Sequence, residues 1–161
     1  MIWNKATSLL VENSALDKIE RAAGDSLFTV EAGGILLGSY KRRCIHVVDA
    51  TTPQKCDSAS RYSFSRDAAG HREIAQHAWQ QSSGTTTYVG EWHSHPEQLP
   101  TPSTIDLDDW RRVMREQKRP MAFIIQGEAG RYLEIRHPLF AKLTLTPVQY
   151  DECGILFKYQ P

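Results

Sequence analysis

Two histidines that stand two residues apart, His93 and His95, are the feature that most constrains this chain of 161 residues. The segment before them, 85–92, reads TTTYVGEW and is rich in β-branched and aromatic side chains, which predicts a strand. Because side chains alternate along a strand, both imidazoles should point to the same face of the sheet. A pair held in this way offers two nitrogen ligands to one metal ion.

A serine and a carboxylate follow the histidines at a short spacing. After Pro96 and six further residues the chain reads Ser103-x-x-Asp106, which has the form of a capping-box start of a helix. A helix that begins there would present the carboxylate from a rigid position and keep the serine hydroxyl near it. Catalytic zinc sites use three protein ligands and leave a position open, whereas structural sites usually close with four, often including Cys. The spacing therefore predicts a catalytic site in which His93, His95 and Asp106 bind Zn²⁺.

A further candidate carboxylate lies far upstream. Glu31 directly precedes an apolar segment, 33–40, that should form a buried strand. A carboxylate at the mouth of such a strand can act as a general base, although a glutamate there is more often simply solvated. Glu91 competes for this role, because it lies two residues before His93 on the same strand face. The residues alone leave Glu91 open as a partner that orients an imidazole or as a plain structural residue.

Patterning along the chain predicts one α/β domain, residues 1–161, with a mixed, mostly antiparallel sheet flanked by helices. Helices alternate with pairs of strands, which disfavours a purely parallel sheet. Strands are expected at 6–11, 33–40, 44–50, 85–95, 121–125, 131–136 and 140–146, with a short extended piece at 62–64. Helices are expected at 13–23, 67–81 and 103–118, the first ended by Gly24. The pattern weakens after Pro147.

The helical period also predicts which side chains face the core. These are Leu16, Ile19 and Ala23 in the first helix, Ile74, Ala75, Ala78 and Trp79 in the second, and Ile105, Trp110, Val113 and Met114 in the third. His71-Arg72-Glu73 imitates the H-x-E of zinc deaminases, but their P-C-x-x-C is missing, so a helix-surface pair is expected. His46, His77 and His137 have no partners at ligand spacing and are expected to be ordinary histidines.

Charge and composition exclude several classes of protein. Lys plus Arg equals Asp plus Glu at 19 each, which is not the footprint of a nucleic-acid binder. No apolar run reaches the ~18 residues of a membrane span, and no signal region begins the chain. The three cysteines are widely spaced without C-x-x-C, which is typical of free thiols in a reducing cytosol. We expect a cytoplasmic protein with no nucleic-acid or membrane partner. Arg111, Arg112, Arg115, Lys118 and Arg119 should form a mostly solvated face; the alternative is contact with an acidic partner.

Taken together, these segments resemble the JAMM metalloprotease signature of the JAB/MPN family. The shared features are an upstream Glu before a Gly-Gly apolar strand (EAGGILLG, 31–38), then H-x-H-P, then S-x-x-D. The resemblance extends over roughly residues 6–138 and implies a cytidine-deaminase-like fold. The family places its general base before the Gly-Gly strand, which favours Glu31 over Glu91.

The resemblance also implies a role for each motif residue. His93, His95 and Asp106 would bind zinc, with water in the fourth position. Glu31 would move a proton from that water to the leaving amine, and Ser103 would hydrogen-bond the water or the developing oxyanion. The family reaction is hydrolysis of an amide, most often the isopeptide bond between a ubiquitin-like C-terminus and a lysine. All five motif positions are intact, which disfavours an inactive family member.

Within the family, the length and the strand G-E-W-H-S-H-P resemble small bacterial deconjugating peptidases, above all those of cyclic-oligonucleotide anti-phage (CBASS) operons. That resemblance implies a protein substrate whose extended C-terminal tail is conjugated to lysine. A nucleotidyltransferase would be the conjugated protein, and E1- and E2-like proteins would be further partners. The alternatives are a processing protease or amidase for a small ubiquitin-like or sulfur-carrier protein, and a non-catalytic MPN scaffold.

Overall fold

The computed structural model describes residues 6–26, 30–138 and 142–161. Its helices are α1 (Asn13–Ser26), α2 (Ala68–Gln81) and α3 (Thr104–Gln117). Its strands are β1 (Ser8–Glu12), β2 (Gly33–Lys41), β3 (Cys44–Ala50), β4 (Ser58–Ala59), β5 (Phe64–Ser65), β6 (Thr87–Ser94), β7 (Met121–Gln126), β8 (Arg131–Arg136), β9 (Leu143–Tyr150) and β10 (Gly154–Tyr159). None of the helices in these ranges combines the length and apolar character needed to span a bilayer.

The main sheet closes on itself in the order β1-β10-β9-β8-β7-β6-β2-β3, while β4 and β5 pair as a separate hairpin. In the described residues, β6–β7 and β1–β3 are parallel and the other pairs are antiparallel. The predicted mixed, mostly antiparallel α/β domain is confirmed. Closure of the sheet was not predicted.

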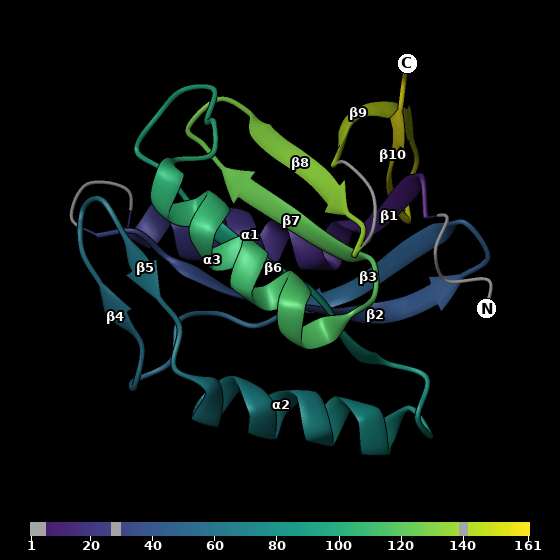
Figure 1. Ribbon diagram of the computed structural model, residues 1–161, viewed down its shortest axis with the longest axis horizontal. Coiled ribbons are helices and arrows are strands. Elements are labelled where there is room, and N and C mark those ends of the chain that lie inside the picture. Colours follow the sequence, from purple (N-terminus) through teal and green to yellow (C-terminus); the bar gives the residue numbers. More distant parts are fainter. Residues whose placement is uncertain (1–5, 27–29, 139–141) are drawn as a thin grey trace.

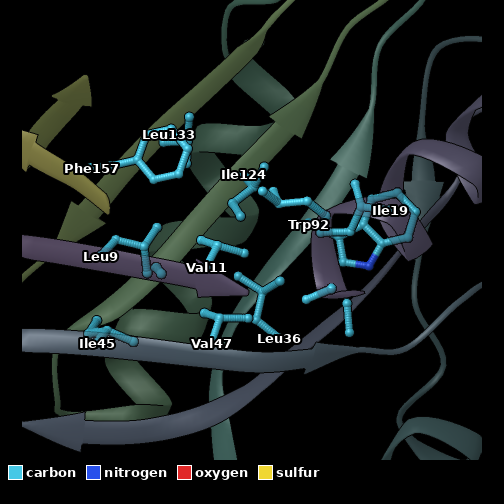
Figure 2. Packing of buried hydrophobic residues seen from close by; sticks show 14 of the residues in the cluster. Leu9, Val11, Ile19, Leu36, Ile45, Val47, Trp92, Ile124, Leu133 and Phe157 are labelled. Atoms are coloured by element: carbon cyan, nitrogen blue, oxygen red, sulfur yellow. The ribbon is translucent and has the colours of Figure 1, made fainter. Parts of the chain in front are cut away.

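Strand β7 separates two apolar clusters, because its side chains alternate between the two faces of the sheet. Ala122 and Ile124 belong to the main cluster, which also contains Ile19 of α1 and Trp92 of β6. Figure 2 shows this cluster between strands and helix. Three other β7 residues pack with Trp110 of α3 in a second cluster (Met121, Phe123, Ile125). Helices α1 and α3 therefore lie on opposite faces of β6 and β7 (Figure 1), and α3 is fixed beside the strand that carries the histidines.

A glycine allows β6 to approach β7 closely. A Cβ on Gly90 would lie 2.0 Å from the carbonyl oxygen of Ala122, so no larger residue fits without separating the two strands. On the other side of β6, His93 pairs with Gly33 of β2. The histidine strand is thus enclosed between two neighbours.

Several predicted details need correction. Helix α1 continues through Gly24 to Ser26, because Gly24 does not adopt the positive φ of a helix-ending glycine, and glycine inside a helix costs only about 1 kcal/mol. Trp79 is 54% exposed, since α2 lies against β2 and β6 only in part and Trp79 packs beside Gly84 instead. Ile105 is 56% exposed, because the turn of α3 that directs Asp106 inward directs Ile105 outward.

The C-terminal part of the chain contains more strand than was predicted. The strand predicted at 140–146 is β9, which runs to Tyr150; residues 140 and 141 lie outside the described residues. Pro147 fits within it at a register shift opposite Phe157, a position where a strand tolerates proline. Strand β10, which was missed, pairs with both β9 and β1 and so closes the sheet. The extended piece predicted at 62–64 overlaps the observed strand β5 only at Phe64, and the strand that pairs with β5, β4, was also missed.

Candidate active site

Strand β6 brings His93 and His95 to one place at its C-terminal end. Their Nε2 atoms lie 3.0 Å apart and both rings are largely buried. The backbone N–H of His95 donates to the carbonyl of Gln126, which keeps the chain beside β7 past the end of the strand. The two imidazoles therefore share a face, as alternation predicts.

Helix α3 supplies the third group. Ser103 is the N-cap, and the capping box is complete: the serine hydroxyl accepts from the Asp106 N–H, and the Ser103 N–H donates to Asp106 Oδ2 at 2.6 Å. The hydroxyl also donates to Asp106 Oδ2 at 2.7 Å. These contacts fix the carboxylate so that Oδ1 lies 3.1 Å from His93 Nε2 and Oδ2 lies 3.2 Å from His95 Nε2.

The three side chains can hold a metal ion between them. Their ligand atoms lie within 4.8 Å of one another, and the closest pairs are 3.0 to 3.2 Å apart. Ligands around a tetrahedral ion with bonds of roughly 2.0–2.1 Å stand about 3.3 Å apart, so the observed spacing needs little adjustment. Two imidazole nitrogens and one carboxylate oxygen that point toward a common centre are suitable ligands for a divalent cation.

Glu31 lies beside this group, although it comes from a distant part of the chain. It is 5% exposed, and its Oε1 is 3.9 Å from His95 Nε2. Burial raises the pKa of Glu31 to about 7, against the opposing charge of His95. A carboxyl group with this pKa can both accept and release a proton near neutral pH, as a general acid–base catalyst requires.

The electrostatics of Asp106 differ from those of Glu31. Burial opposes ionisation of Asp106, but hydrogen bonds from His93 and His95 outweigh it and hold the pKa of this carboxyl far below its usual range. Burial would lower the pKa of His95, yet its hydrogen bond to Asp106 raises it. Two nearby carboxyl groups thus have separate character: one is held as an anion, and the other titrates near neutrality.

The carboxylate that competes with Glu31 has other partners. Glu91 accepts from Arg66 at 2.6 Å and from the Tyr88 hydroxyl at 2.7 Å. It lines a cavity of about 330 Å³ together with His93, Asp106 and residues of β5 and α3. Glu91 and Arg66 therefore form part of a wall beside the candidate site, and the structure gives Glu91 an arginine rather than an imidazole as its ionic partner.

Ser94, which sequence reasoning passed over, links the two parts of the site. Its N–H donates to the Ala32 carbonyl, and its hydroxyl accepts from the Ala32 N–H. Its position between the histidines was the one available signal. Trp110 was predicted as a core residue, and it is; its ring also lies 6.1 Å from that of His93.

His71 was expected on a helix surface, and that prediction is wrong. It is fully buried, with Nδ1 2.6 Å from Thr51 Oγ1 and Nε2 2.8 Å from Asp57 Oδ2. The first turn of α2 packs against the loop that follows β3. His71 is therefore buried, although its neighbours in the sequence are polar. Among the other histidines, His46 pairs with Glu12 and His77 is exposed.

Comparison with known proteins shows which family this sequence matches. Residues 13–137 match the model of prokaryotic homologs of the JAB domain. The chain is 38% identical over 131 residues to a CD-NTase/cGAS isopeptidase of Pseudomonas aeruginosa (strain BWHPSA011 / Pa011), covering 80% of this chain and 83% of that protein. A CD-NTase/cGAS isopeptidase of Vibrio cholerae serotype O1 (strain ATCC 39315 / El Tor Inaba N16961) is 33% identical over 60% of this chain and 62% of its own length.

A solved structure shares the fold. The solution structure of protein DSY2949 from Desulfitobacterium hafniense superposes with a TM-score of 0.60 and 17% identity, covering 84% of this chain and 88% of that one. The JAB/MPN resemblance found in the motifs is confirmed by the family match over residues 13–137. The chain belongs to the family of prokaryotic homologs of the JAB domain.

Proposed function

We propose that this chain is a zinc-dependent isopeptidase that hydrolyses the amide bond between the C-terminus of a conjugated protein and its target. The observation that carries the proposal is the position of Glu31. A buried carboxyl group with a pKa of about 7 lies 3.9 Å from His95, beside three side chains that can hold a metal ion. This combination supports hydrolysis rather than metal storage alone.

Zinc is the proposed metal because of the donor set. Two imidazoles and one carboxylate, with no cysteine among them, are typical of zinc sites that keep a position open. Bound zinc would polarise the scissile carbonyl and lower the pKa of a water molecule.

The chain's own residues have defined tasks in this reaction. Glu31 takes the proton from the attacking water and delivers it to the leaving amine, because it is a buried carboxyl group beside His95 whose burial favours the protonated form that must pass the proton on. Ser103 holds Asp106 in ligand orientation through its N–H and its hydroxyl. The hydroxyl has one proton, which bonds to Asp106 Oδ2 in this structure. To stabilise negative charge on the substrate oxygen, the hydroxyl would turn this proton away from Asp106, while the Ser103 N–H continues to hold the carboxylate.

The proposed substrate is a CD-NTase, a nucleotidyltransferase, joined through its C-terminal tail to lysine of another protein. Support comes from the relatives, which are named CD-NTase/cGAS isopeptidases. The relative from Pseudomonas aeruginosa matches 80% of this chain. The proposal places the enzyme in the cytoplasm as part of an anti-phage (CBASS) conjugation system with E1- and E2-like partners. A processing protease for a small ubiquitin-like or sulfur-carrier protein remains the alternative, and activity on such a protein but not on a CD-NTase fusion would favour it.

The test is cleavage of a CD-NTase fused through its C-terminus to a fluorescent protein. We expect one zinc per chain, cleavage at the end of the tail, and loss of activity with a chelator or with Glu31→Gln. Glu73→Gln is the matched control, because Glu73 is exposed on α2. Full activity of Glu31→Gln would overturn the mechanism, and a purified protein that binds no zinc would favour a non-catalytic scaffold.

A further inference from the structure

We propose that a basic pocket between α3 and the end of β8 is a docking site for acidic side chains on the folded body of the conjugated protein. This inference rests on the proposed function. The pocket, named here the α3–β8 pocket, has a volume of about 450 Å³ and is lined by Arg111, Met114, Arg115, Arg136, His137, Pro138 and Lys142. Nothing in the proposed hydrolysis uses these residues.

Positive charge dominates the α3–β8 pocket. Arg111, Arg115, Arg136 and Lys142 contribute four cationic groups. Glu134, which is fully buried, bonds to Arg136 and lies 3.9 Å from Lys142, and Asp108 pairs with Arg111 at the surface. Two acidic groups against four cations leave a local excess of two positive charges, in a chain whose formal net charge is zero. Within the described residues, Arg115 has no carboxylate at ion-pair distance.

Part of the pocket is held in place before any partner binds. The Arg136 guanidinium lies over the Trp110 ring, 5.2 Å from its centroid, and bonds to Glu134 beneath it. A planar guanidinium fixed in this way loses little rotamer entropy when it meets a carboxylate. Arg111 and Arg115 are four residues apart on α3, so both project from one face of the helix.

The pocket is close to the candidate active site. Trp110 has Arg136 over its ring and lies 6.1 Å from the ring of His93. Along the axis of α3, Arg111 and Arg115 are about 8 and 14 Å beyond Asp106, at 1.5 Å per residue, and they project from the side of the helix that faces away from Asp106. A domain of 100 residues has a radius of gyration of about 13 Å, so a folded protein whose tail occupies the active site can reach the pocket with its surface.

Charge complementarity selects an acidic protein surface as the occupant. Nucleic acid needs basic residues spread as a stripe or over a whole face, whereas here they gather in one pocket of a chain with balanced charge. Exposed cations around a concave site act mainly by steering and orienting a charged partner. Such steering would raise the rate at which the folded part of the substrate associates with the enzyme in an orientation that lets its flexible tail enter the active site.

The experiment compares two substrates and two enzymes. The substrates are a CD-NTase fused through its C-terminus to a fluorescent protein, and a short fluorogenic peptide of the same tail. The test variant is Arg111→Glu/Arg115→Glu, whose side chains are exposed, and the control is Arg43→Glu in the exposed turn between β2 and β3. We expect the test variant to lower the kcat/KM ratio of fusion to peptide about tenfold, through a higher KM for the fusion, with a smaller effect at high salt.

Three results would overturn the proposal. An unchanged ratio would show that the pocket does not contact the body, and an equal loss on both substrates would show an effect through the active site. Calorimetric binding of inorganic phosphate that the test variant abolishes, with no change in the fusion KM, would assign the pocket to a free anion. If the wild-type enzyme cleaves neither substrate, the proposed function fails. The docking proposal is then tested separately, by measuring the affinity of the Glu31→Gln protein for the fusion with and without the two arginine substitutions. Equal affinities would refute docking at the α3–β8 pocket.

Discussion

Ser94 and Ala32 are joined by two hydrogen bonds, each 2.8 Å long, in which the serine N–H donates to the Ala32 carbonyl and the Ala32 N–H donates to the serine hydroxyl. Ser94 lies between the two histidines, and Ala32 directly follows Glu31. The pair therefore sets the position of the proposed general base relative to the proposed ligands. Proton transfer depends on such positioning within an ångström.

Substitution Ser94→Ala removes one of these bonds and keeps the other. We expect kcat to fall roughly tenfold to hundredfold because Glu31 is less well aligned, with zinc content unchanged. The loss in stability should be about 1 kcal/mol, the usual cost of one hydrogen bond. Steady-state kinetics, metal analysis and urea unfolding measure the three quantities. A variant that loses zinc as well would show that Ser94 supports the ligands rather than the base.

Asp106 and Ser103 should differ in their effect on metal binding. Asp106→Ala leaves two imidazoles, and we expect the purified protein to lose zinc. Ser103→Ala keeps all three ligands but removes the hydroxyl that bonds to Asp106, so zinc affinity should fall about 10- to 100-fold. Competition with a chromophoric chelator measures both. Asp108→Ala, an exposed carboxylate on the same helix, is the control, and normal zinc content in Asp106→Ala would exclude its role as a ligand.

The parts of the site that were predictable from sequence are those close together in the chain. Alternation placed His93 and His95 on one face, and the capping box placed Asp106 at a helix start, because both rules depend on neighbouring residues. The position of Glu31 required the family resemblance, since the bonds that hold it join its own N–H to the Ser60 carbonyl and Ala32 to Ser94, a residue 62 positions away. Local patterns carry no information about such a partner.

The same distinction explains what was missed in the fold. Strand β10 closes the sheet by pairing Ser8 with Lys158, and no periodicity within either strand specifies the other. His71 has polar neighbours in sequence and was assigned to the surface, but the loop containing Thr51 and Asp57 covers it. Burial of this kind follows from tertiary contacts, which helix periodicity does not report.

Two glycines provide a matched pair for stability. Gly90→Ala would bring a Cβ to 2.0 Å from the Ala122 carbonyl oxygen and separate β6 from β7, so we expect destabilisation by at least about 2 kcal/mol. Gly24→Ala lies at an exposed position of α1 with nothing within 4 Å of the new Cβ, and it should stabilise by roughly 0.5–1 kcal/mol. Urea unfolding checks both signs. Equal effects would mean that close strand approach at Gly90 does not limit side-chain size.

His137 should make stability depend on pH. Burial lowers its pKa below the usual 6.5, although a hydrogen bond with the Ala6 carbonyl opposes the shift. The unfolded chain therefore binds a proton at a higher pH than the folded one. By linkage, its contribution to stability is present above pH 6.5 and is lost as pH falls below that value. Unfolding free energies from pH 8 to 5 should decline more steeply for wild type than for His137→Asn; parallel profiles would contradict this.

The buried contacts of His71 predict a difference between two histidines of one helix. His71→Ala leaves Thr51 Oγ1 and Asp57 Oδ2 without their ring partner inside the protein, so unfolding free energy should fall by about 3 kcal/mol. His77→Ala removes an exposed side chain from the same helix and should change it by less than about 0.5 kcal/mol. Zinc content should stay normal in both, because the proposed ligands lie on β6, at its end and on α3. Comparable stability of the two variants in urea would show that the Thr51–His71–Asp57 contacts do not stabilise the fold.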